Sequence, residues 1–254
     1  MFDLPPLAGP ARDRAILAHV EAGDFTAPFA TVHSSYNGIN ADFYVFADAL
    51  KIAGVRVSVS AYLEQQVADL LSCSLLTAKL ADLRWAQRAV TLPPLPRPIT
   101  SSTAAMVDQS ARVDRALSVT PETAGIVDSL GKAWLIDALL DAHPGRAINY
   151  GWHFTGPTYA GHAWDSSVTG VGRVIQGRGW AHDFNEVDYS QICCLVSRTC
   201  VVDRQKVDLW ELLRDPALAP LASASGALRT HRQPGVPALG PINAIAEGPT
   251  PVYG

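Results

Sequence analysis

Several features that mark large classes of proteins are scarce in this chain of 254 residues. No run of about 18 apolar residues occurs, so the sequence predicts no membrane-spanning helix. Four cysteines are too few for a disulfide framework at this length, and no CxxC pair indicates a zinc ribbon. Lys and Arg (20) do not outnumber Asp and Glu (24), and the net charge is −4. Nucleic acid is therefore not an expected partner.

The first twenty residues lack a basic segment followed by an apolar run, so they do not resemble a secretory signal. We therefore expect synthesis in a reducing cytoplasm without a signal peptide. Action on the cell wall after release by another route remains compatible with this expectation. The oligomeric state is left open by the sequence.

An apolar fraction of 48% and a charged fraction of 17% are typical of a globular protein. We expect a single α+β domain over residues 1–225, followed by an irregular tail, 226–254, that is rich in Pro, Gly and Ala. Four prolines in residues 91–98 exclude a regular helix there and predict a stiff crossing segment.

Hydrophobic periodicity places the expected elements. Helical spacing and capping residues predict helices at 11–22, 61–73, 74–90, 101–117, 131–143 and 207–215. Alternating or continuous apolar patterns predict strands at 31–36, 41–50, 55–60, 147–154, 172–180 and 187–202, with Asn37-Gly38 as a hairpin turn. This order indicates a helical block packed on an antiparallel sheet.

One arrangement of side chains favours a thiol nucleophile. Cys73 lies between two helical stretches, and a position at the start of the second helix would favour its thiolate. His153 would act as the base and Asp188 would orient the imidazole. Gln65 would supply an amide for the oxyanion. The alternative is that Cys73 is a packed core residue, which is also how we interpret the three cysteines at 193, 194 and 200.

A metal site is the rival interpretation. The region from His153 to Asp183 is rich in imidazole and carboxylate groups, and two His with one carboxylate are typical of zinc hydrolases. His153, His162 and Asp165 would be the first ligands to consider. No HExxH or HxH motif supports this choice, so a site without any cofactor is the main expectation, with zinc as the alternative.

A third interpretation is not catalytic. Trp152, Trp164 and Trp180 flank the histidine-rich stretch, and exposed tryptophans are suited to a glycan-binding surface. In this case the protein would be a glycan-binding or phage structural protein, and Cys73 would only pack in the core.

The sequence also resembles a bacterial family with the pattern Q-x-x-A-D-x-x-G-C-x-L-P-T-x-K, then Y-G-W-H, then D-Y-S-H. The segments QQVADLLSCSLLTAK, NYGWHF and VDYSQ carry the likeness, which extends from about residue 12 to residue 222. It places the cysteine of the pattern on Cys73, the amide on Gln65, the histidine on His153 and the acid on Asp188. Two departures are Leu76 in place of proline and Gln191 in place of the histidine after D-Y-S.

The order of cysteine, histidine and acid also resembles the layout of papain-like NlpC/P60 cysteine peptidases. The likeness implies a hydrolase, a cysteine peptidase or amidase, that cleaves an amide bond in peptidoglycan or in another peptide substrate. A phage endolysin or an enzyme of cell wall degradation would have this activity. The wall substrate follows from the layout and not from any substrate-binding motif.

Overall fold

The computed structural model describes residues 3–120 and 125–242 and has a mixed α+β fold, as expected. Six α-helices and one 3-10 helix are present among these residues: α1 (Pro10–Glu21), α2 (Ala61–Leu70), α3 (Ala78–Ala86), α4 (Thr103–Ser118), α5 (Leu139–Ala142), α6 (Leu209–Arg214) and η1 (Ala219–Leu221). No helix in the described ranges is long and apolar enough to cross a membrane.

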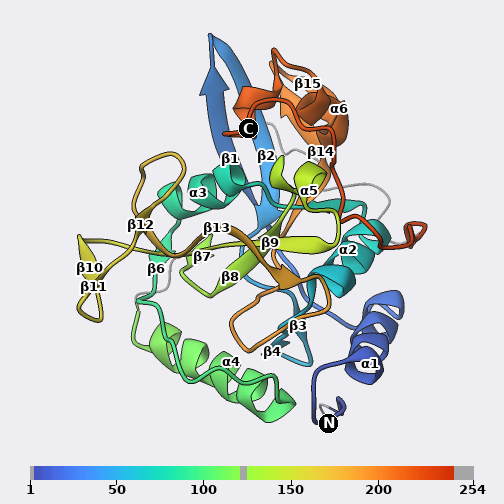
Figure 1. Ribbon diagram of the computed structural model, residues 1–254, viewed down its shortest axis with the longest axis vertical. Coiled ribbons are helices and arrows are strands. Elements are labelled where there is room, and N and C mark those ends of the chain that lie inside the picture. The colour runs from blue at the N-terminus through green and yellow to red at the C-terminus, as the bar shows by residue number, and fades with distance from the viewer. Residues whose placement is uncertain (1–2, 121–124, 243–254) are drawn as a thin grey trace.

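Two antiparallel sheets form the centre of the fold (Figure 1). The first has the order β1-β2-β14-β15, with β5 also paired to β14, and contains β1 (Phe29–Tyr36), β2 (Ile39–Phe46), β5 (Cys73–Leu75), β14 (Leu195–Val202) and β15 (Gln205–Asp208). The second has the order β12-β13-β9-β8 and contains β8 (Lys132–Leu135), β9 (Arg146–Phe154), β12 (Asp165–Ser166) and β13 (Arg173–Asp183).

The remaining strands form three short pairs. They are β3 (Lys51–Ile52) with β4 (Val55–Arg56), β6 (Val90–Thr91) with β7 (Val127–Asp128), and β10 (Thr158–Tyr159) with β11 (His162–Ala163). The β1–β2 hairpin turns at Asn37-Gly38, where both residues have positive φ, as the sequence predicts. It projects from one end of the molecule in Figure 1, and α4 lies at the opposite end.

Local capping explains where several helices begin. The hydroxyl groups of Ser60, Thr77 and Ser102 each accept a backbone N–H of the first turn of α2, α3 and α4. The helix that we expected at 131–143 is wrong over most of its length. Residues 132–135 form the strand β8, because they pair with β9, and only Leu139–Ala142 are helical.

One apolar core joins the two sheets. Trp134 and Leu135 of β8 are fully buried in the same cluster as Leu75 of β5 and Leu195 of β14. A parallel bridge between Leu76 and Leu135 joins the edges of the two sheets. The core therefore draws residues from both sides of the proline-rich segment at 91–98.

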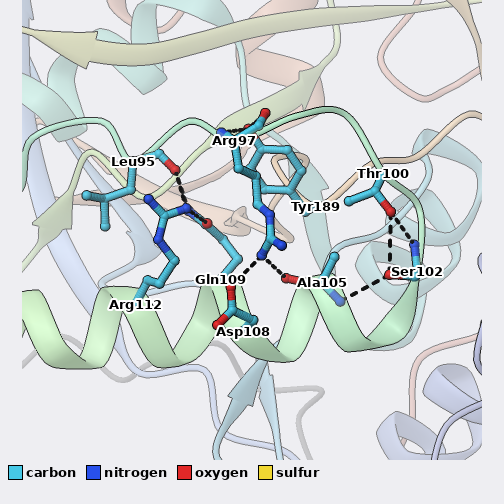
Figure 2. A network of polar contacts seen from close by, with 9 residues as sticks. All are labelled: Leu95, Arg97, Thr100, Ser102, Ala105, Asp108, Gln109, Arg112 and Tyr189. Atoms are coloured by element: carbon cyan, nitrogen blue, oxygen red, sulfur yellow. Dashed lines mark hydrogen bonds and ion pairs between the residues drawn. The ribbon is translucent and has the colours of Figure 1, made fainter.

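That segment belongs to a strap, residues 91–102, that runs along α4 (Figure 2). Arg97 of the strap forms an ion pair with Asp108 at 2.6 Å, and Arg112 donates to the carbonyl oxygen of Leu95 at 3.1 Å. The phenol of Tyr189 donates to the carbonyl oxygen of Arg97. These contacts tie the strap both to α4 and to the segment before β14.

The segment after Gly226 contains no helix or strand in its described part, which ends at residue 242. Leu228, Gln233 and Val236 are nevertheless buried. The described part of the expected tail therefore packs on the rest of the protein. Our expectation for residues 243–254 lies outside the described residues.

Candidate functional site

Cys73 lies in strand β5, so the expectation that it begins a helix is wrong. Its backbone pairs with Ser197 of β14, and α3 begins only after the cap Thr77. The helix dipole that would have favoured a thiolate is therefore not available at Cys73.

Cys73 is 1% exposed, and its Sγ donates to the carbonyl oxygen of Leu71 at 3.4 Å. Burial raises the pKa of this thiol well above its ordinary value. A thiol in this environment stays protonated near neutral pH, and this geometry matches the interpretation of Cys73 as a packed residue.

His153 is buried in β9, and its carboxylate partner is Asp82 of α3 rather than Asp188. The Nε2 atom lies 2.8 Å from Asp82 Oδ1. The ring stacks on Trp85 at a centroid distance of 5.5 Å. Among the described residues, no hydrogen bond joins His153 to Cys73 or to Asp188. The three members of the expected triad are thus held by different partners.

Asp82 is a residue that the sequence analysis missed, and it accepts four hydrogen bonds. They come from the hydroxyl of Tyr150, from His153 and from both the backbone N–H and the hydroxyl of Thr169. Burial alone would raise the pKa of Asp82, but the bonds from His153, Tyr150 and Thr169 lower it below its ordinary value. The network attaches the loop that contains Thr169 to α3.

A sequence signal for Asp82 does exist. It lies among buried residues of α3, four residues after Ala78 and three before Trp85, so it faces the core. A charged residue on an apolar helix face needs a buried partner. The sequence does not show which partner, because Tyr150, His153 and Thr169 lie about 70 to 90 residues further along the chain.

Both polar ends of the Gln65 side chain are engaged inside the protein. Its Nε2 donates to Asp69 Oδ1 at 2.9 Å, and its Oε1 accepts the backbone N–H of Gln233 at 2.8 Å. The structure therefore brings Gln65 to Asp69 and to the C-terminal segment. A role in binding an oxyanion stays a prediction.

The residues proposed as zinc ligands are not brought together. His153 is buried against Asp82, whereas His162 of β11 and Asp165 of β12 are exposed. Within residues 3–120 and 125–242, no three His, Cys, Asp or Glu side chains are grouped so that they can hold a metal ion. The described part of the chain therefore does not support the zinc alternative.

The tryptophans of the proposed glycan surface differ strongly in exposure. Trp152 is buried and packs against Tyr189, whereas Trp180 is 44% exposed and stacks on His143 at 4.5 Å. Trp164 is half-buried. Because Trp152 does not reach solvent, the three rings cannot form one binding surface.

Asp188 lines a cavity of about 410 Å³, which we call the Asp188 pocket. Three segments form it: residues 8–9 before α1, Ile99 and Ser101 of the strap, and a segment that contains His182, Asn185–Asp188 and Gln191. Asp188 Oδ1 accepts the backbone N–H and the hydroxyl of Ser190, and its Oδ2 lies 3.7 Å from Lys132 Nζ. The second oxygen therefore has only a long contact with a positive charge.

Gln191 presents an unused donor in this pocket. The residue is 1% exposed, and its Oε1 accepts the backbone N–H of Asp188. Its Nε2 has no hydrogen-bond partner among the described residues, and it is not one of the polar atoms that the protein encloses without a partner. Gln191 therefore lines the cavity with this donor unpaired.

A second acidic group completes the pocket. Glu186 Oε2 lies 2.9 Å from Nδ1 of His182, and both side chains line the cavity. No Lys or Arg is among the described residues that line it. The carboxylates of Glu186 and Asp188 consequently give the pocket a negative character, and the buried amide of Gln191 adds one hydrogen-bond donor.

Comparison of the chain with models of protein families, with curated proteins and with solved structures found no match. On its own structure, the described chain is a mixed α+β protein with a buried Asp–His network and an acidic pocket.

We expect all four thiols to resist modification in the native protein. Every cysteine is free and buried, and burial raises the pKa of Cys194 and of Cys200 to about 12. A chromogenic thiol reagent at pH 7.5 should label four groups in denaturant and essentially none in buffer over the same minutes. Rapid labelling of Cys73 in the native state, identified with a Cys73→Ala variant, would instead support a reactive nucleophile.

Proposed function

We propose that this protein binds a peptide through its amino-terminal residue, or a small molecule with the same groups, in the Asp188 pocket. The observation that carries the proposal is the Nε2 of the buried Gln191, which has no partner among the described residues while Gln191 and Asp188 line the same cavity. A ligand that satisfies both groups needs a positively charged N–H donor and a nearby acceptor oxygen. An ammonium group next to a peptide carbonyl has both.

The charge of the pocket supports an amine. Glu186 and Asp188 are the acidic residues among the described lining residues, and the ion-pair partner of Asp188 is Lys132, at 3.7 Å. Burial lowers the pKa of Lys132, and the nearby Asp188 carboxylate partly offsets this effect. An ammonium ligand would gain charge-assisted hydrogen bonds that the protein does not already supply.

An apolar side chain on the ligand also has a place. Ile99 lines the pocket and is 85% exposed, and Leu7 on the adjoining segment is 63% exposed. Leu7 pairs with Ser102 of the strap, so the two apolar side chains lie on adjoining segments. Covering them would remove apolar surface from water and add affinity for an aliphatic residue.

Alaninamide is a suitable probe, because it has an ammonium group, a carbonyl and a methyl group but no carboxylate. We expect saturable binding in a calorimetric titration, and binding about tenfold weaker to Asp188→Asn, which loses one charged hydrogen bond. Asp183→Asn is the matched control, because Asp183 is an acid of the same segment that does not line the pocket. N-acetylalaninamide should not bind, since acetylation removes the positive charge.

The proposal fails if the acetylated probe binds as well as alaninamide, or if Asp188→Asn and Asp183→Asn weaken binding equally. A thermal melt of each variant separates lost binding from lost folding. Asp188→Asn keeps an oxygen that can accept the N–H of Ser190, so the local turn should survive the change.

Cleavage of an amide bond stays a prediction, with peptidoglycan peptides as its leading substrate class. Purified cell-wall sacculi provide the test, with release of new amino groups as the measurement. Activity that is lost in Cys73→Ala would support the thiol mechanism. Activity that is equal in Cys73→Ala and lost in His182→Ala would instead place the chemistry in the Asp188 pocket, where Glu186 holds the imidazole.

A further inference from the structure

A second cavity of about 490 Å³ shares no lining residue with the Asp188 pocket. It lies where α2 ends and β5 begins, and it is bounded by strands β14 and β15, by α6 and by the segment at 238–241. We call it the Arg198 pocket. Two positively charged residues, Arg198 and Arg232, and two negatively charged residues, Asp69 and Asp208, are among the residues that line it.

The two carboxylates of the Arg198 pocket are already fully used by the protein. Asp208 accepts Arg198 on Oδ2, and its Oδ1 accepts the first N–H groups of α6. Asp69 accepts Gln65 on Oδ1, and its Oδ2 accepts both Arg232 and the N–H of Leu239. A ligand would therefore find few free acceptors in this cavity.

Hydrogen-bond donors, in contrast, are left over. Arg198 uses Nη2 for Asp208, and its Nε is enclosed without a partner. Its Nη1 has no partner among the described residues and is not enclosed. The hydroxyls of Ser72 and Thr199, which line the same cavity, also have no hydrogen bond within the described part of the chain. A ligand that brings acceptor oxygens would therefore find these donors free of protein partners.

The guanidinium that carries the free Nη1 is held in a fixed orientation. The Arg198 guanidinium lies 3.6 Å above the ring of Trp210 and is tied to Asp208. The indole N–H of Trp210 in turn donates to Ser74, which is buried. A group that is already ordered loses little entropy when a ligand binds to it.

We propose that the Arg198 pocket binds a carboxylate group. A carboxylate oxygen can accept from the free Nη1 of Arg198, and its hydrogen bonds to a charged donor are stronger than those of a neutral carbonyl. Asp69 and Asp208 neutralise much of the charge of the two arginines, which favours a singly charged ligand over a phosphate. A free small acid and the carboxyl end of a peptide share this chemistry.

The indole N–H resonance of Trp210 reports on the site, because the ring lies directly under Arg198. In a ¹⁵N-labelled sample, a Trp210→Phe variant assigns the resonance. Titration with acetate and with N-acetyl-alanyl-alanine should shift it saturably at constant ionic strength. The carboxamide of the same dipeptide should not shift it. Tighter binding of the dipeptide than of acetate would identify a peptide end as the source.

Two variants test the donors. Arg198→Lys keeps the charge but removes Nη1 and the planar guanidinium, and Thr199→Val removes a hydroxyl from a strand that tolerates valine. We expect binding about tenfold weaker in the first and a few-fold weaker in the second. If Arg198→Lys loses its dispersed spectrum, Thr199→Val decides alone. Equal shifts from acid and amide, or unchanged binding in the folded variants, would overturn the proposal.

These probes contain no amine, and the two cavities share no residue. Failure of carboxylate binding would therefore leave the proposal for the Asp188 pocket untouched, and failure of alaninamide binding would leave this one untouched.

Discussion

Replacing Asp82 by alanine is expected to lower the free energy of unfolding by about 3–5 kcal/mol, because each buried polar group left without a partner costs about 1–3 kcal/mol. Asp82 is 1% exposed and accepts four hydrogen bonds. Its loss leaves the buried donors of Tyr150 and His153 without an acceptor, whereas the exposed Thr169 can bond water instead. Chemical denaturation at pH 7 measures the change directly.

Two comparisons make this result specific. Tyr150→Phe removes a hydroxyl that donates to Asp82 and accepts the N–H of Val168, and should cost about 2 kcal/mol, the usual net value of two hydrogen bonds. Asp24→Ala removes an exposed acid that pairs with His19 and should change stability by less than about 1 kcal/mol. A destabilisation by Asp82→Ala as small as that of Asp24→Ala would contradict the structural role of the network.

The same carboxylate predicts a dependence on pH. The pKa of Asp82 is lower in the folded protein than in the unfolded chain, so the folded state favours the ionised form. Its stabilising contribution is full above the unfolded pKa, near 3.9, and is lost as the pH falls through the folded pKa. The stability difference between the wild type and Asp82→Asn should therefore narrow below about pH 4.

Local signals in the sequence predicted much of the fold. Proline at the start of α1, the hydroxyl caps of α3 and α4, and the Asn37-Gly38 turn each act within a few residues, so the sequence indicates where to look for them. It does not single out Thr77 as the cap of α3, which we expected to begin at residue 74 and which begins at Ala78. The prediction of a helix at 131–143 was wrong because the apolar pattern of this segment suits a short buried strand as well as a helix. Pairing of Trp134 with Asn149 on β9 decides between them, and that contact is not local.

The candidate sites show the same limit more strongly. Asp188 was identified from the sequence, but the residues that give it a pocket come from three segments, the first near residue 8 and the last near residue 191. Gln191 attracted attention only as a departure from a family pattern. Its proposed role depends on its Nε2, which has no partner among the described residues, and this lack of a partner can be seen only in the folded chain.

Replacement of Glu64 gives the second large expected effect. Whether the free energy of unfolding falls or rises depends on the residue that replaces Glu64. The residue lies in the first turn of α2 and is fully buried, and its Oε1 accepts the N–H of Cys194 at 2.8 Å. Glu64→Ala leaves that N–H unpaired and opens a cavity, so we expect a loss of about 2–4 kcal/mol in unfolding experiments. Glu64→Gln keeps the acceptor oxygen and the volume.

Burial raises the pKa of Glu64 well above its ordinary value, and the N–H groups of Cys194 and Trp134 offset only part of this effect. The folded protein therefore holds a proton that the unfolded chain releases above about pH 4.3. Wild-type stability should fall relative to Glu64→Gln by about 1.4 kcal/mol per pH unit while the folded carboxyl stays protonated.

The free energies of unfolding of the wild type and of Glu64→Gln should therefore coincide near pH 4 and separate at higher pH. At pH 7, Glu64→Gln should be the more stable protein. Denaturant melts of both proteins at pH 4, 5.5 and 7 measure the separation. A wild type that gains stability over Glu64→Gln as the pH rises would mean that the folded protein favours an ionised Glu64. Such a charge would need a cation close to Oε2, where the described residues provide no partner.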